Sequence, residues 1–199
     1  MCVFIYLKEK QMSQAKTLTQ AELDQVLRFI NTKKFALRNR TMMLTSHWSG
    51  MRVGEIASLS ISDVMNPDKT IKSEIRLTAE QTKGRHPRTV FLPEKLKAEL
   101  ASYLQFRDTS RPEIPLFFTA QQLGFSANSL CQWFFWTYRN AGISGASSHT
   151  GRRNFITSLA NKGISVRVLA SLAGHRSIAV TQKYIDINDD LKRNAVELI

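Results

Sequence analysis

Residues 71–92 read IKSEIRLTAEQTKGRHPRTVFL, and this stretch decides the fold class. Over 71–77 three apolar residues and Ser73 alternate with charged ones, a period of two that predicts a strand with one buried face. Residues 89–92 predict the return strand. Between them, TKGRHP at 82–87 places a glycine and a proline in a turn with a basic tip. The stretch therefore predicts a β-hairpin.

Helical signals surround this hairpin on both sides. Thr19 and Glu22 form a capping box, and apolar residues then recur at helical spacing, which predicts a helix over 20–32. Further helices are predicted near 35–48, 51–59, 94–107, 127–141, 150–162, 165–173, 177–184 and 188–197. The expected N-caps and C-terminal stops are Ser126, Ser165, Ser177, Gly163 and Gly174. The sequence thus predicts a mainly α fold with a small antiparallel β-sheet (α+β).

The chain is organised as one domain. Its 199 residues suffice for one sizeable core, and no repeat or linker divides them. We expect 1–18 to be a disordered N-terminal extension and 19–199 to form a single domain that ends in a tail over 185–199. The natural start is left open between Met1 and Met12.

The composition is strongly basic. Lys and Arg number 28 against 16 Asp and Glu, which gives a net charge of +12 in a sequence that is 43% hydrophobic. Because the basic residues interleave with apolar ones, they indicate a folded basic domain rather than a disordered tail. Such a charge favours a polyanionic partner, nucleic acid above all, although ribosomal and membrane-surface proteins share it.

Cysteine usage points to a reducing compartment. Cys2 and Cys131 lie far apart with no CxxC pair, which argues against a zinc site and a disulfide framework. The apolar run at 2–7 is too short to span a membrane, and no export signal is visible. We therefore expect a cytoplasmic protein that needs no metal or other cofactor and has no membrane partner.

Five features in chain order resemble one family. Cleaving a phosphodiester without a metal requires a nucleophile, proton donors and acceptors, and fixed positive charge around the phosphate oxygens. The features are SGMRVGE at 49–55, the turn lysine Lys83, HTGR at 149–152, AGH at 173–175 and TQKY at 181–184. Together they resemble the motifs of the tyrosine recombinases, which include phage integrases, Xer resolvases and fimbrial DNA inverters. Each motif alone is common by chance, whereas the ordered set is specific.

The resemblance implies the catalytic-domain fold of this family and a role for each matched residue. Tyr184 would attack the scissile phosphate, leaving a 3′-phosphotyrosine and a free 5′-hydroxyl. Arg52 and Arg152 would hold the non-bridging oxygens, and Lys83 would protonate the departing 5′-oxygen. His149 would accept the tyrosine proton or contact the phosphate.

Other residues would support this set. By the same resemblance, His175 would donate a hydrogen bond to the phosphate, and Glu55 would orient Arg52. Candidate DNA contacts are Arg85, Arg88, Arg153, Arg176 and Lys183.

Each residue also has an ordinary structural interpretation. A tyrosine such as Tyr184 on an amphipathic helix is usually a packing residue, and Arg52 with Glu55 could form a helix-surface ion pair. Lys83, Arg85 and Arg88 could form a solvated turn, and His149 and His175 could be local caps. The aromatic run WFFW at 133–136 is expected to pack in the core rather than to stack on bases.

The sequence departs from the family pattern in three places. Gly151 stands where the family usually has leucine, Arg153 where it often has a second histidine, and Ala173 where leucine precedes the glycine. These changes alter packing around Arg152 and leave the proposed catalytic atoms in place.

The N-terminal helical DNA-binding domain of most family members has no counterpart before Arg52. The resemblance therefore implies a short form, similar to fimbrial inverters and small phage integrases, that assembles as a tetramer on double-stranded DNA at a specific site. An accessory DNA-bending protein is a candidate partner. The tail over 185–199 is expected to dock on a neighbouring protomer, with packing on its own domain as the alternative.

The function implied is site-specific DNA recombination through a phosphotyrosine, with a Holliday junction between strand exchanges. A type IB topoisomerase-like relaxing enzyme is one alternative. A non-catalytic DNA-binding regulator on the same fold is another, and the complete set of six catalytic residues argues against it.

Overall fold

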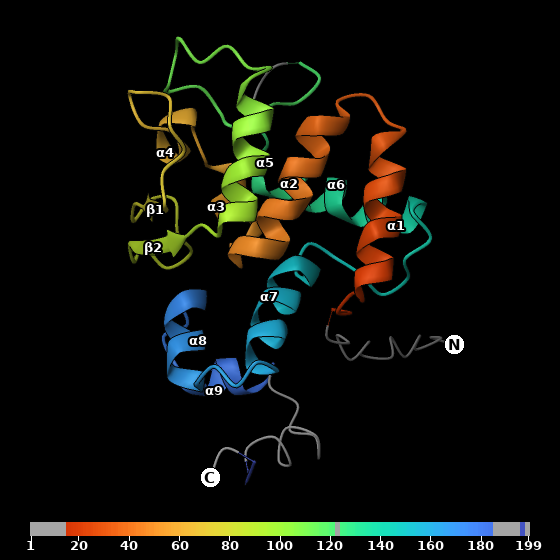
Figure 1. Cartoon of the computed structure of the whole chain (residues 1–199), viewed down its shortest axis with the longest axis vertical. Helices are drawn as coiled ribbons and strands as arrows, with labels where there is room; N and C mark the ends of the chain where they lie inside the picture. Colours follow the sequence, from red (N-terminus) through yellow and green to blue (C-terminus); the bar gives the residue numbers. More distant parts are fainter. Residues whose placement is uncertain (1–14, 122–123, 185–195, 198–199) are drawn as a thin grey trace, which may run out of the picture.

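The computed structural model describes residues 15–121, 124–184 and 196–197 (Figure 1). The helices of this part are α1 (Gln20–Asn31), α2 (Ala36–Ser49), α3 (Val53–Ala57), α4 (Ile61–Val64), α5 (Glu94–Leu104), α6 (Ala127–Asn140), α7 (Thr150–Ala160), α8 (Val166–Ala173) and α9 (Ile178–Gln182). The strands are β1 (Glu74–Leu77) and β2 (Arg88–Phe91). The mainly helical class with a small sheet is confirmed, and the helix expected over 188–197 lies almost wholly outside the described residues.

The predicted hairpin is present. β1 and β2 pair antiparallel, with Ile75 opposite Val90 and Leu77 opposite Arg88. β1 is shorter than the predicted strand because Ile71 forms a bridge with Met65, after α4, and so lies outside the two-stranded sheet. The segment leading into the hairpin is thereby attached to the residues that follow α4.

The core is built around α2, which packs against α1, α5 and α7. Met42, Met43 and Leu44 of α2 are fully buried. Where α7 crosses α2, a Cβ added to Gly151 would lie 2.2 Å from Ser46 Oγ and 2.8 Å from the Ser46 carbonyl carbon. The glycine that departs from the family pattern therefore allows the two helices to approach closely.

The ends of the helices follow the predicted signals. The side chains of Ser126, Ser165 and Ser177 each accept a hydrogen bond from a backbone N–H of the helix they precede. Gly174 ends α8 in the left-handed conformation, with φ 64°. In Figure 1, α7, α8 and α9 gather at one end of the molecule, and the hairpin lies beside α8.

The folded body begins before residue 19. The backbone N–H and carbonyl of Leu18 are both bound by the Asn154 side chain at 2.8 Å, and the Leu18 side chain is buried. The last residues of the predicted N-terminal extension are thus packed against α7, while residues 1–14 lie outside the described part. Among the described helices, none is long and apolar enough to cross a membrane.

Candidate active site

Arg52 stands where the chain leaves α2 and enters α3. Gly50 ends α2 in the left-handed conformation, and a Cβ there would lie 2.4 Å from the Phe155 ring, so only glycine fits. Glu55, one turn into α3, accepts hydrogen bonds from the Arg52 backbone N–H at 2.7 Å and from Arg52 Nη1 at 3.0 Å. Glu55 therefore fixes both the backbone and the guanidinium of Arg52.

Glu55 is a buried carboxylate shared by two arginines. Its side chain is 1% exposed, and Arg88 binds it with Nη2 at 2.7 Å and Nε at 3.2 Å. Burial alone would raise the pKa of Glu55, but its bonds to Arg88 and Arg52 hold that pKa below its ordinary value. The interpretation of Arg52 and Glu55 as a surface ion pair is wrong.

The C-terminal end of α8 binds three arginine side chains. Three consecutive backbone carbonyls at this end each accept a hydrogen bond from a different guanidinium. A helix C-terminus carries partial negative charge and unpaired carbonyls, which suits cations. The bonds are Arg88 Nη1 to Leu172 O at 2.9 Å, Arg152 Nη2 to Ala173 O at 2.6 Å and Arg52 Nη2 to Gly174 O at 3.1 Å.

Arg152 is the most buried of the three arginines at the end of α8. It lies in the first turn of α7, is 4% exposed, and also donates from Nη1 to Gly50 O at 2.6 Å. Burial, and then the charges of Arg52 and Arg88, lower the pKa of Arg152 to about 10. It stays protonated at neutral pH, so the site holds concentrated positive charge.

His175 follows Gly174 directly and is neutral at pH 7. Burial lowers its pKa to about 4, and the positive charges of Arg152, Arg52 and Arg88 act in the same direction. Its Nδ1 lies 2.7 Å from Thr181 Oγ1, which fixes the ring. Its side chain therefore has an anchored orientation and carries no charge of its own.

Tyr184 lies just after α9 and against His175. The two rings stack with centroids 5.7 Å apart and an interplanar angle of 21°. The Tyr184 carbonyl accepts a hydrogen bond from the Thr157 side chain of α7 at 3.2 Å, and the Arg153 guanidinium lies 5.7 Å from the Tyr184 ring centroid. The proposed nucleophile is thus held between α7 and the end of α8.

His149 and Lys83 are far apart in sequence but share their electrostatic surroundings. His149 is the N-cap residue of α7, yet its side chain makes no capping hydrogen bond. Partial desolvation lowers the pKa of His149, and Arg152, Lys83 and Arg52 lower it further. Lys83 is exposed on the hairpin turn, within electrostatic reach of His149.

The candidate DNA contacts occupy different environments. Arg85 on the hairpin tip and Arg176 and Lys183 near α9 are exposed, and Arg153 is half-buried beside Tyr184. Arg88 is 10% exposed, and its guanidinium donates to Glu55 and to the Leu172 carbonyl, so it is not part of a solvated turn. Sequence reasoning missed this environment. A usable signal was the apolar residue Val90, which lies two residues along the same face of the predicted return strand.

The aromatic run at 133–136 does not pack wholly in the core. Phe134 is fully buried and Trp133 packs against the core, as expected. Phe135 is 42% exposed and Trp136 49% exposed, so the expectation is wrong for these two. All four lie on α6, and consecutive helical residues point in different directions, which a run of four aromatic letters conceals.

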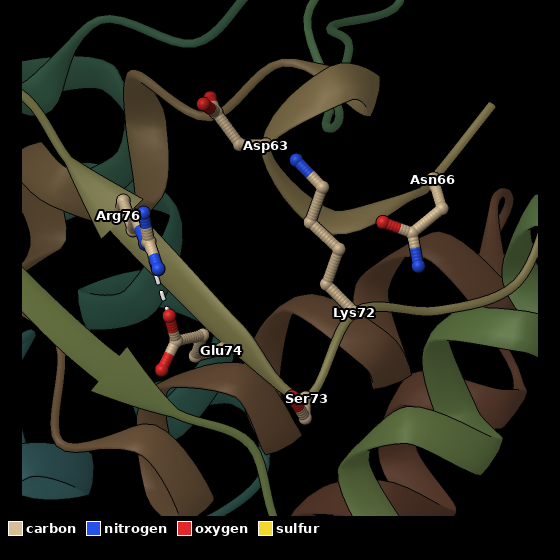
Figure 2. Close-up of a pocket in the computed structure, with 6 residues that line it drawn as sticks. All are labelled: Asp63, Asn66, Lys72, Ser73, Glu74 and Arg76. Carbon is tan, nitrogen blue, oxygen red and sulfur yellow. Dashed lines mark hydrogen bonds and ion pairs between the residues drawn. The ribbon is translucent and has the colours of Figure 1, made fainter.

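A separate polar pocket lies on the far side of β1 from β2, beside α4 (Figure 2). Arg76 donates to Glu74 at 3.0 Å, and Lys72 reaches the Ser62 carbonyl. None of the predicted catalytic residues lines this pocket. Within residues 15–121, 124–184 and 196–197, no group of His, Cys, Asp or Glu side chains is arranged to hold a metal ion.

A sequence profile described as "Phage integrase family" matches residues 16–190. The chain belongs to the phage integrase family of tyrosine recombinases. The tyrosine recombinase XerA of Pyrococcus furiosus is 30% identical to it over 187 residues, which cover 92% of this chain and 61% of that protein. The tyrosine recombinase XerC of Lactobacillus leichmannii is 28% identical over 194 residues, covering 94% and 63%.

Solved structures agree on the fold of this family. The crystal structure of XerA recombinase superposes with a TM-score of 0.71 at 25% identity, covering 94% of this chain and 64% of that one. The integrase of transposon Tn1549, solved in complex with circular intermediate DNA, gives a TM-score of 0.70 at 20% identity, covering 92% and 66%. The chain spans a little over three-fifths of the length of the XerA and XerC proteins it matches.

Proposed function

We propose that this chain is the catalytic part of a site-specific DNA recombinase that cuts and rejoins DNA through a 3′-phosphotyrosine at Tyr184. The observation that carries the proposal is the cluster at the end of α8. There Arg52 and Arg152 are anchored on adjacent carbonyls, and His175, the next residue along, stacks on Tyr184. Fixed cations beside a tyrosine are what metal-independent phosphoryl transfer requires.

The arginines stabilise the charge that develops on the phosphate. A guanidinium has five N–H donors, and the bonds to the α8 carbonyls, Glu55 and Gly50 leave others for the non-bridging oxygens. Because the two guanidiniums are already positioned, they need little reorganisation when the pentacoordinate transition state forms. Neutral His175 donates a further hydrogen bond to the phosphate.

Protons move at two places. His149 is neutral at pH 7, since its pKa lies below the ordinary value, and it therefore accepts the proton of the Tyr184 hydroxyl or contacts the phosphate. Lys83, on the hairpin turn, protonates the departing 5′-oxygen. The phosphotyrosine conserves the energy of the broken bond, so the 5′-hydroxyl of a second strand can reverse the step without ATP.

The partner we propose is double-stranded DNA carrying a specific site. Two exchanges of strands would pass through a Holliday junction within a homotetramer, and an accessory DNA-bending protein would assist the assembly. The DNA-bound Tn1549 integrase supports DNA as the partner. For a protein that acts on DNA, we expect the cytoplasm of a cell or of a phage host as the location.

The alternatives have less support. XerA and XerC, to which the chain is similar, are recombinases, not topoisomerases or regulators. A regulator would also need no anchored pair of arginines beside a tyrosine.

Arg152→Ala tests the proposed role of the arginine cluster. The variant should bind duplex DNA within about threefold of wild type and lose about 10²–10³-fold in cleavage rate, since one donor to a developing oxyanion contributes that much. Gel-shift titration measures binding, and the rate of covalent adduct formation on a nicked duplex, with a chelator present, measures cleavage. Equal cleavage rates in the two proteins would remove Arg152 from the mechanism.

A further inference from the structure

Arg88 is bound by protein groups that belong to the site. Its Nε and Nη2 hold the two oxygens of Glu55, and Nη1 donates to Leu172 O at 2.9 Å. The stem lies flat on Gly174, where an added Cβ would sit 2.6 Å from Arg88 Cδ. A guanidinium offers a planar fork suited to such a carboxylate, which lysine cannot reproduce.

Arg88 is also the first residue of β2, directly after the turn that carries Lys83. That turn is closed on itself, because the Thr82 hydroxyl lies 2.8 Å from the His86 carbonyl and 3.1 Å from the Ala79 carbonyl. Pro87 restricts the backbone between the turn and Arg88. A bond that fixes Arg88 therefore also fixes the base of the turn.

Two parts of the site are thus joined through one side chain. One part is the hairpin, which carries Lys83. The other part is the end of α8 together with Glu55, whose oxygens accept the hydrogen bonds that hold Arg52 and Arg152. β2 and α8 approach each other where the Arg88 side chain crosses from one to the other.

We propose that Arg88 is a positioning residue that anchors the Lys83 hairpin to Glu55 and the end of α8, and so sets the general acid against the arginine cluster. The proposal rests on the proposed function. Arg88 itself does not touch DNA; it acts through Lys83.

A sulfur-substituted substrate separates this role from a general structural one. Replacing the bridging 5′-oxygen at the cleavage point by sulfur creates a thiolate leaving group, which departs without a general acid because a thiol is far more acidic than an alcohol. A defect that acts through Lys83 is therefore corrected by the sulfur substrate. A defect in phosphate binding or in folding persists on both substrates.

The variants are Arg88→Met and Lys83→Met, with Arg76→Met as matched control. Arg76 is on the same hairpin and carries the same charge, but its side chain is exposed and its partner is the half-buried Glu74, away from the end of α8. On the oxygen substrate Lys83→Met should lose about 10²–10⁴-fold in cleavage rate, and Arg88→Met at least about tenfold. Arg76→Met should stay within about threefold of wild type.

On the sulfur substrate Arg88→Met should recover to within about threefold of wild type, as Lys83→Met does. The double variant should be no slower than Lys83→Met on the oxygen substrate, because residues that act through one group are not additive. If Arg88→Met folds poorly, as judged by its thermal transition, Arg88→Lys carries the same comparison. Arg88→Lys keeps a cation beside Glu55 without the fork.

Equal loss on both substrates, additive losses in the double variant, or no loss in Arg88→Met would each overturn the assignment. Failure of the proposed function looks different, since wild type itself would then form no adduct on either substrate.

Discussion

Gly151 shows how the residue beside a proposed catalytic arginine can be restricted to glycine by packing. It precedes Arg152, and its Cα faces Ser46 of α2 so closely that a methyl group would overlap both the hydroxyl and the backbone of Ser46. The position of Arg152 relative to Gly50 therefore depends on the close approach of α7 to α2.

Gly151→Ala should destabilise the protein by about 1–3 kcal/mol, because the added methyl group forces the two helices apart or strains their backbones. Urea unfolding measures the free energy of unfolding. Gly54→Ala is the matched control, since a Cβ at Gly54 meets only the Ala127 Cβ, at an ordinary 3.7 Å. The control should be neutral or more stable, by up to about 1 kcal/mol, as expected for glycine replaced inside a helix. Equal effects in both variants would contradict this role of Gly151.

At the residue scale, the sequence predicted which side chains lie together better than it predicted their surroundings. Arg52, Arg152, His175 and Tyr184 follow from motifs that keep residue type and spacing, and they meet at the end of α8. The burial of Arg88 was not expected, because it depends on which strand face meets α8, and that is set by packing between segments far apart in the chain.

At the element scale, α8 contributes to the candidate active site through the carbonyls at its C-terminus more than through its side chains. Its last carbonyls hold the three arginines, and Gly174 ends the helix so that His175 turns back toward Thr181. The end of α8 was predictable from Gly174. That its carbonyls would receive guanidiniums from three other elements was not, because no local pattern encodes a contact across the fold.

α2 contains a buried histidine that makes stability depend on pH. His47 is 5% exposed, its Nε2 lies 3.0 Å from the Tyr138 hydroxyl, and burial lowers its pKa from the ordinary 6.5 to about 4. As the pH falls, the unfolded chain binds this proton before the folded protein does. The contribution of His47 to stability is therefore complete above pH about 6.5 and is lost as the pH falls toward about 4.

His47→Gln should flatten this dependence. Between pH 6.5 and 4 the free energy of unfolding of wild type should fall more steeply than that of the variant, by up to about 1.4 kcal/mol per pH unit. Guanidinium unfolding at a series of pH values measures both slopes. Identical slopes in wild type and His47→Gln would show that His47 is not the group responsible.

On the scale of the whole molecule, the net charge of +12 is expected to attract DNA mainly through the basic residues near Tyr184. Arg176 and Lys183 are exposed near Tyr184, whereas Arg111 is exposed and paired with Glu113. The segment after α5 that contains Arg111 lies at the other end of the molecule from α7–α9 (Figure 1).

DNA affinity should therefore fall steeply as the salt concentration rises. How much a single arginine contributes to this salt dependence should depend on where it lies on the molecule. In a Tyr184→Phe background, Arg176→Ala should lower the slope of log affinity against log salt by about one, while Arg111→Ala should leave the slope unchanged. Fluorescence anisotropy over a range of salt concentrations measures both slopes. A change of equal size in the two variants would mean that the charge acts without a defined DNA face.

Covalent attachment of Tyr184 to DNA is the step that the proposed function requires above all others. Wild type, Tyr184→Phe and a nicked duplex carrying the recombination site should be incubated without metal ions, and the denatured products digested and analysed by mass spectrometry. Wild type should yield a peptide with a 3′-phosphonucleotide on Tyr184, and Tyr184→Phe should yield no adduct. An adduct that persists in Tyr184→Phe, or one attached to another residue of wild type, would contradict the mechanism.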